Sequence, residues 1–403
     1  MLQEITIKNF KSIVNDTIEL GRVNVFIGEN GCGKSNILEA VGFASAAVEG
    51  RANNENLFSK GIRIAKPMLT VSNFKGNKPN KNFSFRFQFK RDTENEFYKN
   101  FKEMLIQFSS PEKENINSKW TVNIGFNTYS VTNELTKVIE ESFGGKSPSS
   151  LLKLATIWLK GDHSSDNSFL GFMELHERDF LIYALNTLSL RGLIQESRKE
   201  PVGVYGENMD VLLTSFNDEE IAKLKDYQHL ITWMADFFVD KGDLLKLQGY
   251  KLNRSLSMLY FSDKYMQKKN NIFSSENANE GILHILFYLA VMISKHTPKF
   301  FAIDNIESCL NPHLCRHLME EICKLAKSED KQLLITTHNP AILDGLNLFD
   351  DEVRLFEVKR NDKGHTQARR ITLKPEVQND MGERYKLSEL WTRGYLGAIS
   401  NQF

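Results

Sequence analysis

Residues 28–35 hold three glycines, a lysine and a serine at a spacing that can bind phosphate groups. The segment is GENGCGKS and matches the pattern G-x-x-x-x-G-K-[ST]. Glycines let backbone N–H groups converge on phosphate oxygens, because no Cβ atom obstructs the approach. At this spacing Lys34 can reach the β- and γ-phosphates, and the hydroxyl group of Ser35 can bind Mg²⁺. The pattern therefore predicts a site for a nucleoside triphosphate with magnesium.

The segments on either side of this loop are of the types that would position it. Residues 23–27 form an apolar run typical of a buried parallel strand, and residues 36–47 have apolar side chains at helical spacing. The amino end of that helix would favour an anion. The alternative is a glycine turn that merely caps an ordinary helix. Cys32 occupies a variable position of the loop, and a regulatory thiol there is a second alternative.

A second group of polar residues can complete a magnesium site. Residues 300–303 read as a buried strand that ends in Asp304, and a phosphate loop needs a carboxylate at such a strand end to hold Mg²⁺. An apolar run ending in aspartate is common by itself. Here it is followed by Glu307 and, after another strand over residues 332–336, by His338. The combination indicates one site built from distant segments.

Composition limits the class of protein. The chain has 403 residues, with 51 basic and 51 acidic side chains and therefore no net charge, which argues against a globally cationic nucleic-acid binder. Hydrophobic residues make up 41%, enough for a packed core. We find no run of 18 apolar residues and no signal peptide, and the four cysteines form no disulfide framework. These features predict a cytoplasmic protein without a membrane partner.

The rest of the chain divides by its periodicity. Alternation over residues 68–74, 83–89 and 120–126 predicts an antiparallel sheet, whereas residues 97–108 could form a helix. Helical spacing then predicts helices over 151–159, 169–190 and 219–238, and two strands over 353–359 and 368–373 read as a hairpin. We predict three parts: residues 1–131 with the phosphate loop and a β lobe, a helical insertion over 132–245, and a second ATPase lobe over 246–403.

Several motifs together resemble those of the ABC-type ATPases of the RecF, SMC and OLD group. The matching segments are 7–12 (IKNFKS), 28–36 (Walker A), 203–209 (GVYGENM), 279–281 (NEG, a degenerate signature), 304–312 (DNIESCLNP, Walker B and D-loop) and 336–340 (TTHNP, the switch histidine). The resemblance implies an α/β fold, an ABC ATPase head of the P-loop NTPase class with an antiparallel β lobe and a helical insertion. It also implies ATP and Mg²⁺ as ligands.

The resemblance assigns roles to particular residues. Those that would contact ATP in one subunit are Asn30, Gly31, Cys32, Gly33, Lys34, Ser35 and Asn36. Asn279, Glu280 and Gly281 would contact the ATP of a second copy in a head-to-head dimer or higher oligomer, although they could merely cap the helix that follows. Ser35 and Asp304 would hold the metal. Glu307, His338 and Asn305 would form the catalytic set.

One position departs from the pattern of the group. The group usually has Asp-Glu at the end of Walker B, and this chain has Asp304-Asn305. Asparagine can orient a water molecule but cannot accept its proton. Two interpretations remain open: Glu307 is the general base, or hydrolysis is slow and ATP mainly holds the dimer together. His338 would sense the γ-phosphate, or would be a structural histidine.

The compact pattern looks like the ATPase subunits of two-gene antiphage systems such as Septu, PARIS and AbiL. That implies a sensor that controls a separate effector, often a nuclease, because the stretch after Pro340 is too short for the Toprim nuclease of many OLD proteins. A RecF-like DNA-repair clamp that acts without an effector is the alternative, and a transporter ATPase is a weaker one. Lysines in residues 75–81 and 264–269 are candidate DNA contacts or ordinary solvated loops.

Overall fold

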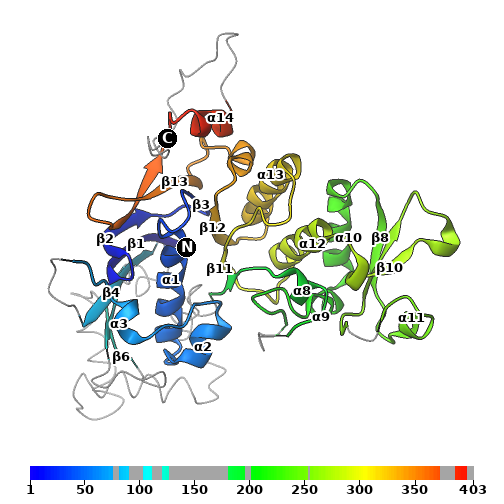
Figure 1. Ribbon diagram of the computed structural model, residues 1–403, viewed down its shortest axis with the longest axis horizontal. Helices are drawn as coiled ribbons and strands as arrows, with labels where there is room; N and C mark the ends of the chain where they lie inside the picture. Colours follow the sequence, from blue (N-terminus) through cyan, green and yellow to red (C-terminus); the bar gives the residue numbers. More distant parts are fainter. Residues whose placement is uncertain are drawn as a thin grey trace, which may run out of the picture.

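The computed structural model describes residues 1–75, 81–89, 103–110, 120–126, 180–195, 201–252, 255–372 and 386–396. These residues form two large sheets, one small sheet and several covering helices (Figure 1). The ABC ATPase head predicted from the motifs requires a phosphate loop between a parallel sheet and a helix, and the structure contains that arrangement.

The first sheet is antiparallel, as predicted for the β lobe. Its order is β2-β1-β4-β5-β6. The strands are β1 (Leu2–Phe10), β2 (Ile13–Glu19), β4 (Asn82–Phe89), β5 (Glu103–Ser109) and β6 (Thr121–Phe126). Alternate side chains such as Ile5, Ile7 and Phe85 are fully buried, because one face of the sheet covers the core and the other faces water.

The second sheet has the predicted site residues at one edge. Its order is β14-β13-β3-β12-β11-β7, and all neighbours are parallel except β13 and β14. The strands are β3 (Val23–Ile27), β7 (Ile182–Tyr183), β11 (Phe300–Ile303), β12 (Gln332–Thr337), β13 (Val353–Arg360) and β14 (Thr366–Ile371). Because β3, β12 and β11 are adjacent and parallel, the residues that follow them meet at their carboxyl ends.

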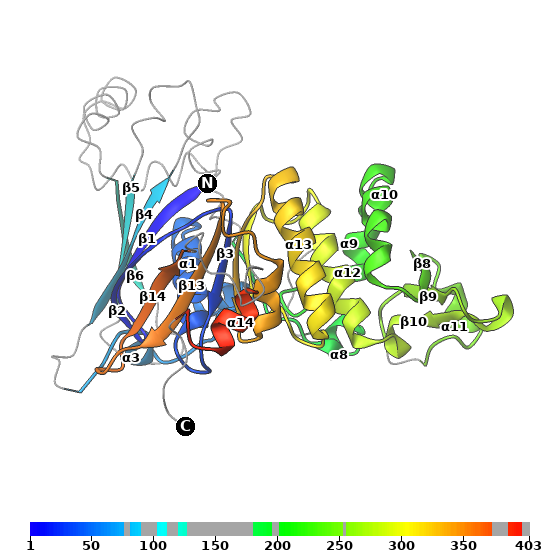
Figure 2. The same ribbon diagram turned by 90° about the horizontal axis from the view of Figure 1, so that it is seen from above.

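Helices cover both faces of this second sheet (Figure 2). Helix α1 (Lys34–Val48) lies between the two large sheets, in a core that includes Phe26 and Phe356, whose rings stack at 5.0 Å. On the other face lie α12 (Glu280–Ile293) and α13 (Pro312–Ser328). The strands are apolar on both sides because both faces are buried.

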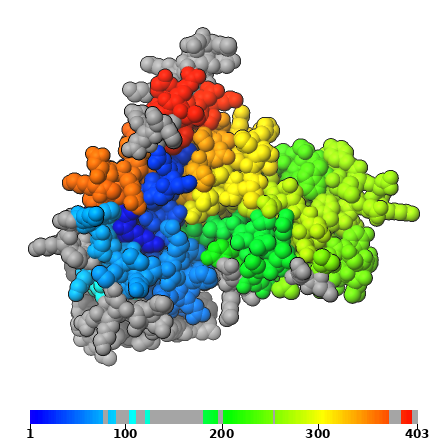
Figure 3. All heavy atoms as spheres, in the orientation of Figure 1, coloured from blue at the N-terminus to red at the C-terminus, as the bar shows by residue number. Residues whose placement is uncertain are grey.

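The third sheet lies at the far end of the molecule, on the right of Figures 1 and 3. It is antiparallel, with the order β10-β9-β8. The elements of this region are α8 (Thr187–Leu190), α9 (Met209–Thr214), α10 (Asp218–Asp226), η1 (Tyr227–Leu230), β8 (Met234–Val239), α11 (Leu244–Leu247), β9 (Leu259–Asp263), η2 (Lys268–Asn270), β10 (Ile272–Ser274) and η3 (Ser275–Asn277). The remaining elements are α2 (Asn54–Ser59), α3 (Pro67–Thr70), η4 (Pro340–Gly345) and α14 (Leu387–Thr392).

Two predictions for the β lobe were wrong. Residues 68–74 do not form a strand: Pro67 starts the short helix α3, and only Val71 makes an isolated bridge to Phe10. Proline at the first position of a helical turn has the backbone angle that the turn requires. The possible helix over 97–108 is strand β5 in its described part, because β5 pairs along its length with β4 and β6.

The helix predicted over 219–238 is only half correct. Helix α10 is stabilised by a capping box between Asn217 and Glu220 and ends at Asp226, and β8 then pairs with β9. A strand partner far along the chain overrides helical spacing. Within 169–190, the described residues form β7 and α8 instead of one helix. β7 pairs with β11, and its Ile182 N–H donates to the carbonyl group of Lys60.

The helix predicted over 151–159 lies outside the described residues, as does most of the predicted insertion before residue 180. The division at residues 131 and 245 therefore stays a prediction. None of the helices in the described parts of the chain is long and apolar enough to cross a membrane. All four cysteines are free thiols.

One helix side chain makes stability depend on pH. His284 of α12 is 1% exposed, neither ring nitrogen has a partner among the described residues, and burial lowers the pKa of the imidazole to about 4. Between pH 6.5 and 4 the unfolded chain therefore binds a proton that the folded chain does not. We expect unfolding free energy to fall by up to about 3 kcal/mol across that interval.

Denaturant titrations at pH 7.5 and pH 5 measure this effect. His284→Leu should remove most of the loss at pH 5, because leucine fills a similar volume and does not titrate. The exposed His296→Gln serves as the matched control and should behave like the wild type. An unchanged pH dependence in His284→Leu would show that another group is responsible.

Candidate active site

The phosphate loop has a backbone that requires glycine. Gly31 and Gly33 have positive φ angles of 77° and 110°. A Cβ atom at Gly33 would lie 2.2 Å from Thr366 Oγ1, and one at Gly28 would lie 2.1 Å from the carbonyl oxygen of Val358. The hairpin formed by β13 and β14 therefore packs directly against the loop. The glycines are fixed both by backbone angle and by close packing.

Lys34 is held inside this loop. Its Nζ atom donates hydrogen bonds to the carbonyl oxygens of Gly28 at 2.7 Å and Glu29 at 3.0 Å, and the residue is 7% exposed. These are neutral acceptors, so phosphate oxygens can replace them at the same ammonium group with a stronger, charge-assisted bond. Cys32 lies nearby, and burial raises the pKa of its thiol. A raised pKa disfavours the reactive thiolate that a regulatory cysteine needs.

The two residues expected to hold the metal are in contact. Ser35 Oγ, at the start of α1, donates to Asp304 Oδ2 at 2.9 Å, at the end of β11. The hydroxyl group of Thr336 donates to the other carboxylate oxygen of Asp304. A hydroxyl group and a carboxylate this close to a phosphate loop are hard oxygen donors of the kind that Mg²⁺ binds together with substrate phosphates. The donor set therefore fits Mg²⁺.

Glu307 and His338 form a hydrogen-bonded pair. Glu307 Oε1 lies 3.0 Å from the backbone nitrogen of His338 and 3.1 Å from its Nδ1. The glutamate side chain is 8% exposed and the imidazole is 49% exposed. An Nδ1–H group that donates to the carboxylate leaves Nε2 as the proton acceptor of a neutral imidazole. Within the pair, the histidine is the member that reaches solvent.

Asn305 has a local structural reason to be asparagine. It has a φ angle of 57°, in the left-handed region, directly after Asp304. Among residues with a side chain, asparagine and aspartate enter this region most readily. Its backbone N–H donates to Thr336 Oγ1 at 2.9 Å. The residue is half-buried at the same strand edge as Asp304.

A shell of polar side chains supports the loop, and it combines residues from the motifs with residues outside them. Asn36 Nδ2 donates to Ser12 Oγ at 2.7 Å, and Thr366 Oγ1 donates to the carbonyl oxygen of Cys32 at 2.6 Å. Arg63 donates to Asn36 Oδ1 at 3.1 Å, and its hydrogen bond to the carboxylate of Glu39 raises the pKa of its guanidinium group. Sequence reasoning had no signal for Arg63 or Thr366, since each is a single polar residue outside any motif.

The signature residues lie on a different element. Asn279 caps α12, and its side chain accepts the backbone N–H of Gly281 at 2.9 Å. Glu280 lies 3.9 Å from the guanidinium group of Arg191, which also donates to the carbonyl oxygen of Ala278 at 3.2 Å. The structure therefore joins residues 28–36, 304–307 and 336–338 in one site. It places 279–281 at the amino end of α12, in contact with the end of α8.

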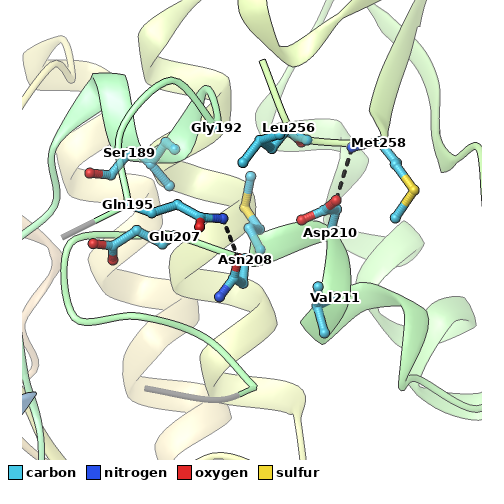
Figure 4. A pocket seen from close by; sticks show the side chains of 12 residues that line it. Ser189, Gly192, Gln195, Glu207, Asn208, Asp210, Val211, Leu256 and Met258 are labelled. Carbon is cyan, nitrogen blue, oxygen red and sulfur yellow. Dashed lines mark hydrogen bonds between the residues drawn. The ribbon is translucent and has the colours of Figure 1, made fainter. Parts of the chain in front are cut away.

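The segment 203–209 lies beside a cavity of about 200 Å³ between α8, α9 and residues 256–258, which precede β9 (Figure 4). Asp210 Oδ2 accepts the backbone N–H of Met258 at 2.9 Å, and Gln195 Nε2 donates to Asn208 Oδ1 at 3.2 Å. The Glu207 carboxylate is 1% exposed and accepts the backbone N–H of Tyr205 at 3.0 Å. The lining of this cavity contains no residue of the phosphate loop. The contacts described for segment 203–209 are therefore with its own neighbourhood.

Comparisons with known proteins show which family and which fold this chain shares. Residues 23–344 match the family described as "AAA domain, putative AbiEii toxin, Type IV TA system". A DNA double-strand break repair Rad50 ATPase of Saccharolobus solfataricus is 37% identical over 75 residues, which are 18% of this chain and 9% of that protein. Its counterpart from Methanocaldococcus jannaschii is 44% identical over 62 residues, which are 15% of this chain and 6% of that protein.

A solved structure of an SMC head bound to the C-winged helix domain of ScpA has a similar fold. It superposes with a TM-score of 0.54 at 13% identity, covering 92% of this chain and 98% of that one. The matches to the Rad50 proteins span less than a tenth of their length. The family match covers most of the chain and includes the phosphate loop, Asp304 and His338. The chain therefore belongs to this AAA-domain family and has the fold of an ABC-type ATPase head, similar to that of an SMC head.

Proposed function

We propose that this ATPase is the sensor subunit of a bacterial antiphage defence system. In this proposal it binds ATP with Mg²⁺, hydrolyses it slowly, assembles head to head and controls a separate effector, a nuclease. One observation carries the enzymatic part: Ser35 and Asp304 are in contact beside Lys34, and the Glu307–His338 pair lies at the same sheet edge. The motif resemblance and the toxin-antitoxin description of the family support the defence role.

Each residue of the site has a defined task in this proposal. Lys34 and the N–H groups of the loop bind the β- and γ-phosphates, and the amino end of α1 adds a favourable dipole. Ser35 and Asp304 hold Mg²⁺, which when bound neutralises charge on the phosphate oxygens. Asn305 orients the attacking water molecule. His338 contacts the γ-phosphate side of the site through its exposed imidazole.

The slow rate follows from the missing carboxylate next to Asp304. Asn305 cannot accept a proton, so a base must be supplied from elsewhere. Glu307 is the nearest candidate; its carboxylate accepts a hydrogen bond from the backbone N–H of His338, and the imidazole Nδ1 atom lies 3.1 Å from the same oxygen. It can take the proton directly, or through the imidazole that it orients. Either route lacks the carboxylate that the resembling ATPases usually have directly after the metal aspartate.

Head-to-head assembly would complete the site from a second copy. In this arrangement the N–H groups at the amino end of α12, next to Asn279 and Gly281, face the γ-phosphate bound by the partner. Arg191 offsets the negative charge of Glu280 at that end. ATP then acts as a bridge between two copies, and its hydrolysis separates them. Higher oligomers are compatible with the same contact.

The alternative function is a RecF-like clamp that binds DNA ends without an effector. The relation to Rad50 double-strand break repair ATPases favours it. Exposed lysines of the β9–β10 hairpin, Lys264, Lys268 and Lys269, are the described residues most suited to a DNA backbone. Both functions place the protein in the cytoplasm, together with DNA or with a DNA-cutting partner.

A DNA-binding titration distinguishes the two functions. The purified protein with ATP and Mg²⁺ is mixed with linear DNA at 150 mM salt. As a sensor subunit it should bind DNA weakly, with a Kd in the non-specific range of about 10⁻⁶ to 10⁻⁴ M. Tight binding by the protein alone would favour the clamp. Co-expression with its genomic neighbour in a phage challenge provides the complementary test, with a Lys34→Ala variant as the inactive control.

A further inference from the structure

A buried threonine at the end of β12 links the groups that follow β11. Thr336 is 0% exposed, and its Oγ1 accepts the backbone N–H of Asn305 at 2.9 Å while donating to Asp304 Oδ1. Its carbonyl oxygen accepts the N–H of Ile306 at 3.3 Å. One residue therefore binds three successive positions of the turn that carries the metal carboxylate. Neither the motif comparison nor the sequence pattern gives it a role.

The direction of the Thr336 hydroxyl hydrogen follows from counting the donors and acceptors around Oγ1. A threonine hydroxyl group has one hydrogen to donate. The Asn305 N–H occupies a lone pair of Thr336 Oγ1, so the single hydrogen of that hydroxyl group is free to point at the carboxylate of Asp304. Carboxylate oxygen Oδ1 is bound by Thr336 and lies 3.2 Å from Ser35 Oγ, and Oδ2 lies closer to Ser35, at 2.9 Å. Thr336 thus holds the carboxylate by one oxygen, and the other is left on the side of the Ser35 hydroxyl group.

Threonine suits this position better than the apolar residues before it on β12. Leu334 and Ile335 fill the two cores on either side of the sheet. A hydroxyl group buried there costs free energy unless it is hydrogen-bonded, and here it is bonded twice. Branching at Cβ also restricts its side chain to few rotamers, so its Oγ1 is held in place. The left-handed backbone of Asn305 is stabilised by the bond that it donates.

We propose that Thr336 is a positioning residue for ATP hydrolysis: it fixes the carboxylate of Asp304 toward the metal and the backbone of Asn305 toward the attacking water. The inference rests on the proposed Mg²⁺-dependent hydrolysis. It also links two parts of the site, because His338 lies two residues farther along the same chain segment. If His338 moves when it contacts the γ-phosphate, Thr336 would move with it, and the hydrogen bond from Thr336 to Asp304 would change.

The test compares three variants with the wild type. Thr336→Val keeps the shape and removes the hydroxyl group, Thr336→Ser keeps the hydroxyl group, and Thr297→Val is a matched control. Thr297 is also a buried, hydrogen-bonded threonine, but its Oγ1 contacts the carbonyl oxygens of Val291 and Ser294 and accepts from Lys331 Nζ, and none of these three is a residue of the site. Two quantities are measured: the Mg²⁺ dependence of kcat at saturating ATP, and the Kd of ATP in EDTA.

For Thr336→Val we expect a kcat about 10- to 100-fold below wild type and a half-saturating Mg²⁺ concentration about tenfold higher. The Kd of ATP in EDTA should stay within about threefold of wild type, since Lys34 and the loop are intact. Thr336→Ser should recover most of both losses, and Thr297→Val should leave both quantities unchanged. A purely structural role would instead lower stability without separating kcat from ATP affinity.

Wild-type kcat and Mg²⁺ dependence in Thr336→Val would overturn the inference. So would an equal loss in Thr336→Ser, because the methyl group and not the hydroxyl group would then matter. If Thr336→Val does not fold, Thr336→Cys takes its place, and its weak donor should give an intermediate loss. Absence of Mg²⁺-dependent hydrolysis in the wild type would contradict the proposed function itself, which distinguishes that failure from a failure of Thr336.

Discussion

Lys34→Ala should bind ATP about 30- to 100-fold more weakly than the wild type and should have no measurable ATPase activity. The physical reason is the loss of the only ammonium group whose described contacts lie within the loop, where it donates to the carbonyl oxygens of Gly28 and Glu29. Those bonds show that the group already points into the space that the phosphates would enter. Isothermal titration with a slowly hydrolysed ATP analogue measures the affinity.

Lys299→Ala is a suitable control for this experiment. Lys299 is 57% exposed and pairs loosely with Asp330, so its loss should leave ATP affinity unchanged. Any biological activity of the protein should disappear with Lys34→Ala, because the proposed assembly depends on bound ATP. Retention of wild-type affinity in Lys34→Ala would refute the assignment of the phosphate loop.

Glu307→Gln should lower kcat by about 100-fold or more while ATP affinity stays within about threefold. Glutamine can still accept one hydrogen bond from His338, but it cannot take a proton or stabilise an imidazolium ion. ATP-bound dimers should therefore accumulate, and their lifetime can be followed by size-exclusion chromatography with light scattering. Single-turnover kinetics separate the chemical step from binding and product release.

The variant Glu320→Gln is the control for the loss of one glutamate charge away from the site. Glu320 pairs with Arg316 on an exposed part of α13, so its replacement should leave kcat near the wild-type value. Unchanged turnover in Glu307→Gln would eliminate Glu307 both as the base and as the residue that orients His338. Slow hydrolysis would then proceed without a protein base.

The sequence identified the phosphate loop, Asp304 and the switch segment, because each is a short motif whose residue types are dictated by local chemistry. The same holds for strands β3 and β11, whose limits are those predicted from their apolar runs. A parallel strand buried on both faces leaves a continuous apolar signal that needs no partner to be recognised. The prediction for the residues of β5 was ambiguous, and the strand predicted over residues 68–74 was wrong. Alternation of apolar and polar residues does not show whether a neighbouring strand is present to pair with.

Local sequence thus predicted which residues would bind phosphate and metal, since glycine backbone angles, one lysine and strand-end carboxylates are properties of short segments. Only the tertiary structure decided how they are held. Thr336, 32 positions along the chain, donates a hydrogen bond to Asp304. Thr366 of the β13–β14 hairpin packs so closely against Gly33 that a Cβ atom there would clash. The tertiary structure also paired Glu307 with His338, across 31 positions. Such contacts depend on strand order and register, which no short segment contains.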